Sequence, residues 1–285
     1  MLKYGINDVD NEAYHSDRKF KSSSTLKLFL KDPREFYKRY VLNEPREEMF
    51  KSAYDFGSYV HSLILEPHLT DSEFAVFEGV TRRGKLYDEF KKLHEGKTIL
   101  TASQAQQAKD LVDVYKDNPD TDGIICDGKA EHTVCVNLDG MDIKVRTDYI
   151  KEGQIIDVKT TSDPVDKFSA AKTIIRFDYD LSAALYVDAI NKYTGKEHDF
   201  IFVFLNKTQN DVSVLKASNE LIENGRRKYK AAIKGLLEAE RTGKYFKEGI
   251  QEVDLPSWAV FDAGSNWYVK RLQTGFKLCK WTYKR

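Results

Sequence analysis

The sequence of 285 residues contains only three cysteines, Cys126, Cys135 and Cys279, and no two of them have the spacing of a C-x-x-C pair. Disulfide frameworks, zinc ribbons and four-cysteine iron–sulfur clusters need more cysteines in closer groups. The scarcity of cysteine therefore argues against all three kinds of protein, and the three thiols are expected to be inert.

Long apolar runs are also missing. Apolar stretches such as residues 200–205 are far shorter than the ~20 residues that a membrane-spanning helix needs. Residues 1–8 lack the apolar core of a secretory signal peptide. The sequence therefore predicts a cytoplasmic protein with no membrane partner.

The sequence has no excess of charge of either sign, because 45 Lys and Arg balance 45 Asp and Glu. The chain as a whole is therefore not a general polyanion binder, and any nucleic-acid surface must come from locally segregated charge. It also lacks low-complexity tracts and internal repeats, which argues against solenoids and arrays. Its hydrophobic content of 41% is sufficient for a substantial core.

Helix and strand patterns alternate along the chain. Helices are predicted over residues 22–43, as a hairpin or kinked helix, and over 53–65, 101–116, 178–193 and 219–241. Strands are predicted over residues 130–134, 141–150, 154–160, 200–206 and 211–216. This order predicts an α/β fold with a mixed central sheet flanked by helices and with a helical N-terminal region.

The most informative segment is a predicted hairpin formed by residues 141–150 and 154–160. A two-residue or a four-residue turn within residues 151–154 gives the same register, which puts Asp148 directly opposite Asp157. Opposed like charges destabilise a sheet unless a cation lies between them, and a hard divalent cation with oxygen ligands meets that need. Lys159 lies two residues after Asp157 and therefore points to the same face. Two acids, a lysine and a metal suit phosphodiester hydrolysis.

The alternative interpretation of this segment is a solvated hairpin with its charges outside and its apolar side chains inside. A D-x-K triplet on its own favours that alternative. The positions of Asp148 and Asp157 near the ends of two predicted strands favour a site, because rigid sites are usually built on such ends.

Four further residues are candidates for the same site, and each has a structural alternative. Glu131 begins the neighbouring strand, where it either faces the site or makes ordinary cross-strand pairs. Arg146 shares a strand face with Asp148 and is a candidate to hold a carboxylate or a phosphate. His61 is either a metal ligand or a structural helix residue. Tyr179, at the start of a helix, either reaches the site or belongs to the core.

Together these residues resemble the PD-(D/E)xK nuclease superfamily and, within it, the RecE-type exodeoxyribonuclease VIII proteins of phages and prophages. The resemblance extends over about residues 22–258. Its motifs are residues 24–36, residues 57–67 with His61, residues 82–85, residues 130–134, Arg146-Thr147-Asp148, residues 156–161 and residues 179–186.

The resemblance implies a restriction-endonuclease-like core and assigns roles to the candidates. By that resemblance His61, Asp148 and Asp157 would bind Mg²⁺ or Mn²⁺, and Lys159 would position or activate the attacking water. Glu131 and Tyr179 would support the site. The chain departs from the family pattern at Ser182, where glutamine is usual, and at Thr147, where proline is usual; neither departure replaces a metal ligand.

The pattern along the chain predicts the domain limits. Residues 1–21 are an N-terminal lead, and residues 22–254 form a single nuclease domain with a helical part over 22–118 and a sheet core over 119–254. Residues 255–285 are an aromatic and basic tail, which is a candidate to stack on single strands, to cover a subunit interface or to join the core. Its candidate residues are Trp258, Trp267, Tyr268, Lys270, Arg271, Lys277, Lys280, Trp281, Tyr283, Lys284 and Arg285.

The activity implied by the family is digestion of linear double-stranded DNA from the 5′ end, which exposes 3′ single strands for an annealing protein in a bacterial host cell. A ring-shaped homo-oligomer is implied as well. The alternatives are an endonuclease or a single-strand nuclease on the same scaffold, and a non-catalytic DNA-binding or assembly protein. Candidate phosphate contacts are the basic residues Arg82, Arg83, Lys85, Arg226, Arg227, Lys228 and Lys230, although such clusters are usually solvated faces.

Overall fold

The computed structural model describes residues 1–44, 52–79, 82–250 and 252–255, and the chain divides into two compact units, Met1–Phe246 and Lys247–Arg285. The described residues of the second unit form no helix or strand. Apart from Leu255, the predicted aromatic and basic tail lies outside the described residues. In the part of the chain that is described, no helix combines the length and apolar character needed to cross a membrane.

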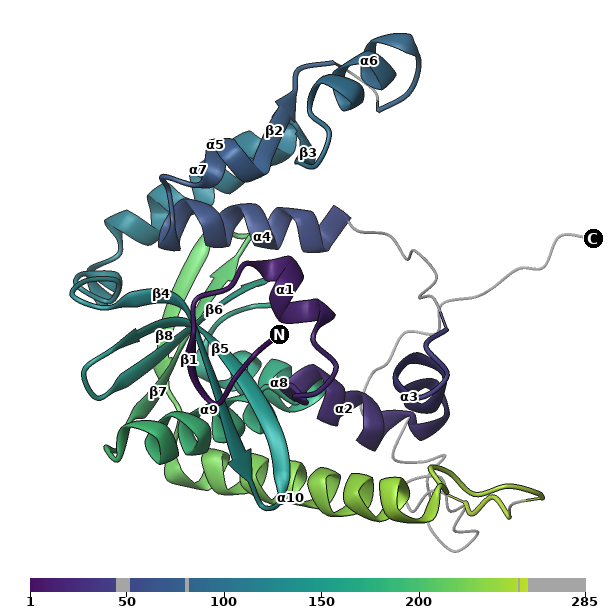
Figure 1. The fold of residues 1–285 in the computed structure, drawn as a ribbon. Coiled ribbons are helices and arrows are strands. Elements are labelled where there is room, and N and C mark those ends of the chain that lie inside the picture. The colour runs from purple at the N-terminus through teal and green to yellow at the C-terminus, as the bar shows by residue number, and fades with distance from the viewer. Residues whose placement is uncertain (45–51, 80–81, 251, 256–285) are drawn as a thin grey trace, which may run out of the picture. The chain divides into compact units, whose positions relative to one another are not determined.

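A six-stranded sheet with the order β1-β4-β5-β6-β7-β8 forms the centre of the first unit (Figure 1). Only β6 and β7 are parallel, and every other neighbouring pair is antiparallel. The predicted mixed sheet is therefore confirmed. Its strands are β1 Gly5–Asn7, β4 Lys129–Leu138, β5 Met141–Lys151, β6 Gln154–Thr161, β7 Asp199–Asn206 and β8 Asp211–Lys216.

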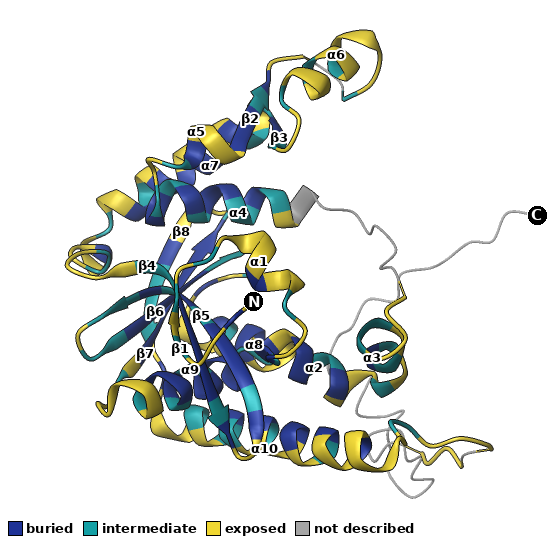
Figure 2. Cartoon of the chain, viewed as in Figure 1, coloured by how far each residue is buried: buried dark blue, intermediate teal, exposed yellow. Residues whose placement is uncertain are grey.

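Helices cover both faces of this sheet. One face packs against α2 (Ser23–Lys31), α3 (Pro33–Tyr40), α9 (Tyr179–Thr194) and α10 (Asn219–Thr242), and the other packs against α4 (Ser52–Leu65) and α7 (Ala102–Asp117). Strand β7 shows the alternation that this requires: its three phenylalanines face the first set of helices, and its Ile, Val and Leu face the second. Figure 2 shows the buried residues concentrated in the strands and in α9.

The helices begin where the sequence supplies caps. Ser22 accepts the backbone N–H of Thr25 at the start of α2. Thr101 and Gln104 form a reciprocal capping box at the start of α7. These caps satisfy amide groups that have no partner within the helix, and the predicted helix starts are correct to within one or two residues.

Several short elements were not predicted. They are β1 Gly5–Asn7, α1 Asn11–Ser16, α5 Thr70–Glu73, β2 Phe74–Phe77, α6 Lys85–Leu93, β3 Thr98–Thr101, the 3₁₀ turn Pro119–Thr121 and α8 Lys167–Arg176. Strands β2 and β3 form a separate parallel pair. Except for the ten-residue helix α8, each of these elements is too short, or too highly charged, to show a clear hydrophobic period.

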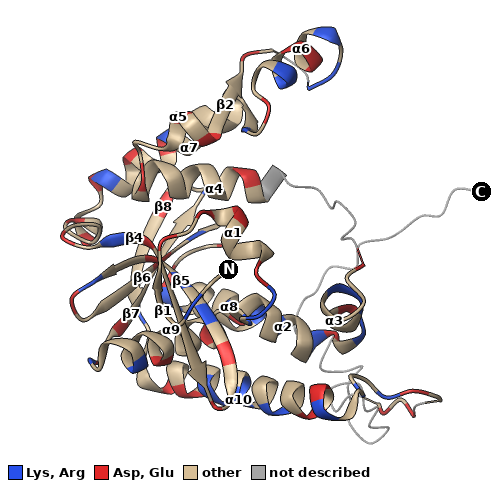
Figure 3. Ribbon diagram, in the orientation of Figure 1, with Lys and Arg blue, Asp and Glu red and all other residues tan. Residues whose placement is uncertain are grey.

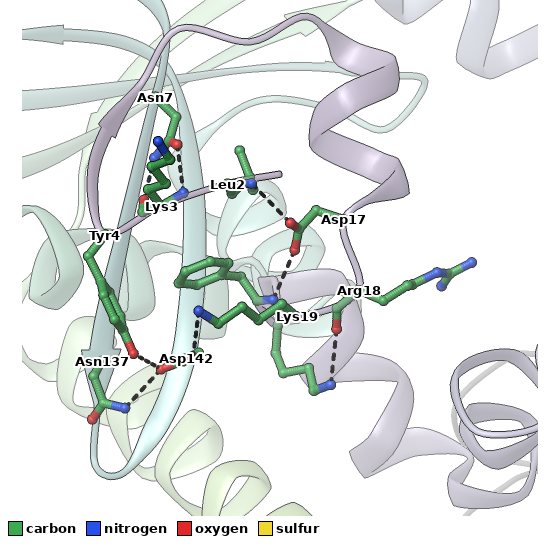
Figure 4. Close-up of polar contacts among 11 residues, drawn as sticks. Leu2, Lys3, Tyr4, Asn7, Asp17, Arg18, Lys19, Asn137 and Asp142 are labelled. Carbon is green, nitrogen blue, oxygen red and sulfur yellow. Dashed lines mark hydrogen bonds and ion pairs between the residues drawn. The ribbon is translucent and has the colours of Figure 1, made fainter.

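The N-terminal segment, residues 1–21, completes one edge of the sheet, because β1 pairs with β4. Figure 4 shows the polar contacts that hold it: Asp17 accepts the backbone N–H of Leu2 at 3.1 Å, and Tyr4 donates to Asp142 on β5. Lys144 on β5 donates to the carbonyl of Asp17 at 2.8 Å. This segment is therefore packed as part of the first compact unit.

The two hairpins that build the site have two-residue turns. Asp139 and Gly140 adopt φ values of +49° and +87° between β4 and β5, a conformation that Asp-Gly turns favour. Between β5 and β6, Lys151 pairs with Gln154, and Gly153 has a φ of +72°. The predicted register of the second hairpin is confirmed where the two strands pair.

Candidate active site

Three carboxylates form a row across β4, β5 and β6. The pairs on either side of Glu131 in β4 and Asp148 in β5 put these two residues opposite each other. Pairing of β5 with β6 ends at Tyr149 and Ile156, and the same register continued by one residue puts Asp148 opposite Asp157. The backbone of Glu131 has a left-handed φ of +47°, which is unusual for a strand residue and marks a local distortion at this row.

Lys159 lies beside this row, as the two-residue spacing from Asp157 predicts. Its Nζ atom is 2.6 Å from Asp157 Oδ1 and 3.8 Å from Asp148 Oδ2. Asp148 also accepts the backbone N–H of Val158 at 2.7 Å, beyond the point where β5 and β6 stop pairing. The Asp148 carboxylate thus accepts a hydrogen bond from β6 where backbone pairing has ended, and this bond holds it close to Lys159.

His61 reaches the same place from α4. Its Nδ1 atom lies 3.7 Å from Asp148 Oδ2. Helix α4 comes near β6 at Gly57, where an added Cβ would lie 3.1 Å from Thr160 Oγ1. Ligand-type atoms of His61, Glu131 and Asp148 all lie within 4.8 Å of one another. The structure therefore brings together two of the three predicted metal ligands and adds Glu131 to them.

Burial and repulsion by Asp148 raise the pKa values of two carboxyl groups of this site. Burial and the charge of Asp148 raise the pKa of Glu131 to about 8, although Arg146 opposes the shift. Burial also raises the pKa of Asp157, which is 4% exposed, despite the nearby ammonium. Burial alone would lower the pKa of Lys159, but Asp157 and Asp148 outweigh it and keep the lysine protonated.

This arrangement fits a divalent metal ion. Imidazole nitrogen and carboxylate oxygen are ligands for Mg²⁺ and Mn²⁺, and a cation would relieve the repulsion that raises the pKa of Glu131. Among the described residues, the group of ligand atoms within 4.8 Å consists of His61, Glu131 and Asp148. Asp157 is next to this group but pairs with Lys159, so its role as a ligand stays a prediction.

Arg146 is used within the protein. Its Nε atom donates to Thr133 at 2.8 Å and lies 3.9 Å from Glu131 Oε2. Its other nitrogens donate to the carbonyl of Val9 at 2.7 Å and to Asn11 Oδ1 at 3.1 Å. Arg146 thus ties the N-terminal segment to the sheet beside the carboxylates, and the predicted phosphate contact would require it to release these partners.

Tyr179 begins α9 and lies beside the lysine, as predicted. The Nζ atom of Lys159 is 5.5 Å from the centre of the Tyr179 ring, and Nζ of Lys27, on α2, is 5.1 Å from the same centre. Burial, and then the positive charge of Lys159, lower the pKa of Lys27 to about 8. Lys27 is a residue that sequence reasoning missed, because nothing in its local pattern distinguishes it from other helix lysines.

The predicted phosphate contacts before β4 lie in a different part of the first unit. Arg82 donates to the carbonyl of Ile99 at 2.9 Å and to Gln104 at 2.5 Å, and Arg83 and Lys85 are exposed. Figure 1 shows α6, which begins at Lys85, well away from β4, β5 and β6. The structure therefore does not bring these three residues to the carboxylate row.

The predicted phosphate contacts on α10 divide into two kinds. Arg226 Nη2 lies 2.5 Å from Asp188 Oδ1, and Lys228 Nζ lies 2.9 Å from Asp180 Oδ1. Both are therefore engaged in ion pairs between α9 and α10. The other two are Arg227 and Lys230, which are exposed.

Glu131 could have been assigned to the ligand group from the sequence. The Asp139-Gly140 turn pairs Leu138 with Met141, and counting back along both strands puts Glu131 opposite Asp148. The length of the Asp139-Gly140 turn was therefore the sequence signal that places Glu131 opposite Asp148.

Comparisons with known proteins agree with this geometry. A family model described as a "PDDEXK-like domain of unknown function (DUF3799)" matches residues 22–245. A crystal structure of a "Putative exonuclease" from Eubacterium rectale is similar, with a TM-score of 0.62 and 16% sequence identity, over 95% of this chain and 100% of that chain. A comparison with curated proteins found no match. At this identity the structural likeness shows the fold alone, and the family model together with the observed sheet and helices confirms the predicted restriction-endonuclease-like core.

Proposed function

Because the chain belongs to the family of PDDEXK-like domains designated DUF3799, we propose that it is a metal-dependent deoxyribonuclease that digests linear double-stranded DNA from its ends. The observation that carries this proposal is the group formed by His61, Glu131 and Asp148 beside the ammonium of Lys159. A half-buried group of two carboxylates and an imidazole, next to a fixed lysine, suits metal-dependent phosphodiester hydrolysis.

The proposed ligands of Mg²⁺ or Mn²⁺ are His61, Asp148 and Asp157, with Glu131 added because of its place in the structure. When bound, the metal supplies Lewis acidity toward a phosphate oxygen and lowers the pKa of the attacking water. Lys159 adds positive charge where the transition state accumulates negative charge. Asp157 holds that ammonium at 2.6 Å, which fixes its position before DNA arrives.

The finer parts of the proposal are digestion from the 5′ end, delivery of a 3′ single strand to an annealing protein, and assembly as a homo-oligomeric ring. The RecE-type motifs of the sequence support them. The description of the Eubacterium rectale protein as a "Putative exonuclease" supports the dependence on DNA ends.

A degradation assay tests the proposal. Blunt linear duplexes labelled at either the 5′ or the 3′ end, and covalently closed circles of the same sequence, are incubated with Mg²⁺, with Mn²⁺ or with a chelator. The expected result is metal-dependent loss of the linear duplexes alone, with early release of the 5′ label.

Each other outcome would indicate a different function. Cleavage of the closed circles would show an endonuclease on the same scaffold, and attack on single strands alone would show a single-strand nuclease. Tight DNA binding with no degradation under any condition would contradict the enzymatic proposal and favour a non-catalytic DNA-binding protein.

A further inference from the structure

An exposed aromatic stack adjoins the catalytic lysine. Phe177 follows the last residue of α8 and is 48% exposed, which is unusual for so large an apolar side chain beside a buried centre. Its ring stacks on the Tyr179 ring, with centroids 5.6 Å apart and planes inclined by 29°. The Tyr179 ring of this stack also adjoins the site, because the ammonium of Lys159 lies 5.5 Å from its centroid.

The turn that carries the stack is fixed by the backbone. Asp178, between the two rings in sequence, has a left-handed φ of +51°. Lys228 on α10 holds the Asp178 carboxylate at 2.6 Å. The intervening residue is therefore anchored, and Phe177 and Tyr179 are presented in a set orientation before any ligand binds.

Positive charge surrounds this stack. Nζ of Lys27 lies 5.1 Å from the Tyr179 centroid, and the guanidinium of Arg176 lies 4.5 Å from the Phe177 centroid. Arg176 is neutralised by an ion pair with Asp163. Lys27 forms no ion pair or hydrogen bond with any residue in the described ranges, and the pKa of Lys27 is lowered to about 8 by burial and by Lys159. The negative charge of a bound anion would offset both the burial and the repulsion by Lys159, and would therefore raise the pKa of Lys27 again.

Building on the nuclease function proposed above, we propose that Phe177, Tyr179 and Lys27 form a subsite for one unpaired nucleotide of the cleaved strand. The base stacks on the exposed part of the Phe177 ring, and the phosphate of that nucleotide contacts the ammonium of Lys27. Aromatic rings combined with cations bind single strands of any sequence, because every base has a flat π-face. A base inside a duplex has both faces covered by its neighbours, so this stack selects a base that has left the duplex.

A binding experiment separates the ring from the charge. A fluorescent oligothymidylate and a fully abasic strand of equal length are titrated with the full chain in a chelator, so that no hydrolysis occurs. Phe177→Ala is expected to lower the preference for the base-bearing strand by roughly 5- to 150-fold, the usual range for stacking of one base. Lys27→Met is expected to weaken binding of both strands alike and to reduce the dependence of affinity on salt by about one ion.

The same helix offers a matched control. Phe168 on α8 is also an exposed phenylalanine, at 69%, and it packs under Lys172 rather than on Tyr179. Phe168→Ala should therefore leave the preference for bases unchanged. Phe177→Leu keeps an apolar side chain without the ring, and should behave as Phe177→Ala if the alanine variant is less stable.

The outcomes distinguish the subsite from the nuclease. If the wild type digests linear DNA with Mg²⁺ but Phe177→Ala retains the full preference for bases, the proposed subsite is contradicted and the proposed nuclease function is supported. If Phe177→Ala and Phe168→Ala lose the preference equally, the subsite is also wrong. If the base preference depends on Phe177 but no DNA is degraded with any metal, the subsite stands and the enzymatic proposal fails. A wild-type chain that binds neither strand overturns the subsite.

Discussion

Two clusters of acidic and basic side chains in the first unit contain the same residue types but differ in their charge balance. Between α9 and α10, Asp188 accepts two hydrogen bonds from Arg226, at 2.5 and 2.7 Å, and one from Tyr229. In the carboxylate row on β4 to β6, the cation paired with Glu131 among the described residues is Arg146, at the longer distance of 3.9 Å. We call the first cluster balanced, because Asp188 has close donors, and the second unbalanced, because burial and Asp148 raise the pKa of Glu131 despite Arg146.

The same contrast holds for the second acid of the helix pair. Asp180 is fully buried, yet Lys228 and Asn224 donate to its two oxygens at 2.9 and 2.6 Å. Gly225 allows this approach, because a Cβ there would overlap the backbone carbonyl of Asp180. A buried acid with direct partners indicates a structural role, and a buried acid without enough partners indicates a missing cation.

The comparison explains why charge alone was a weak guide to function. Figure 3 shows Lys and Arg alternating with Asp and Glu along α10. The sequence marks Arg226 and Lys228 as candidate phosphate contacts, but their partners are Asp188 on α9 and Asp178 directly before it, 38 and 50 residues away. Only the fold reveals that these cations are already in use.

The largest expected effect is on catalysis at the unbalanced cluster. Lys159→Ala should lower the rate of linear duplex degradation by at least about 100- to 1,000-fold, because it removes the charge that meets the transition state. DNA binding, measured by anisotropy in a chelator, should change little. Lys234→Ala, an exposed lysine on α10, is the matched control and should keep wild-type activity. Wild-type rates in Lys159→Ala would show that the lysine has no role in the chemistry.

The next effect is on stability at the balanced cluster. Asp188→Ala leaves Arg226 and Tyr229 without their common partner, and should lower the free energy of unfolding by about 2–3 kcal/mol. The activity of each folded molecule should be unchanged, because Asp188 does not belong to the site. Denaturant unfolding and active-site titration together check this. A loss of activity without a loss of stability would contradict the structural role assigned to Asp188.

The expected effect on metal affinity is smaller, and it again differs between the two clusters. Asp157→Asn should weaken Mn²⁺ binding by at least about tenfold, because it removes one charged oxygen from the proposed ligands. The matched variant Asp188→Asn should bind Mn²⁺ as the wild type does. Calorimetry measures both. Unchanged affinity in Asp157→Asn would limit the ligands to His61, Glu131 and Asp148.

The sequence predicts the site well where local turn geometry determines it. Two-residue turns set the registers of β4, β5 and β6, so Asp148, Asp157 and Lys159 could be placed on one face before the fold was known. Long helices and strands show enough hydrophobic period to be recognised. The predicted site is therefore most reliable within the two hairpins.

What the sequence does not predict depends on contacts between distant segments. Lys27 meets Tyr179 only because α2 packs beside α9, and no local pattern records that meeting. Strand β1 and helix α1 are too short to show a period, although β1 forms an edge of the sheet and Asn11 of α1 accepts a hydrogen bond from Arg146. Tertiary packing decides these positions, so they require coordinates.

The smallest expected effect is a pH dependence that belongs to the unbalanced cluster alone. Glu131 has a pKa of about 8 in the folded protein and an ordinary value of 4.5. Between these values the folded state holds a proton that the unfolded state has released. The free energy of unfolding of the metal-free protein should therefore fall as the pH rises from 4.5 toward 8. Asp148, which faces Glu131, strengthens this effect, and Arg146 weakens it.

Glu131→Gln removes the titrating group and should flatten this part of the profile, so that the metal-free variant melts a few degrees above the wild type near pH 8. Glu152→Gln, in the exposed turn of the neighbouring hairpin, should keep the wild-type slope. Saturating Mn²⁺ should stabilise the wild type most at high pH, because it competes with the proton for the same carboxylate. Melting temperatures measured across pH, with chelator and with Mn²⁺, test these expectations. Parallel curves for Glu131→Gln and the wild type would mean that Glu131 is already balanced, and the contrast between the two clusters would then rest on Asp157 alone.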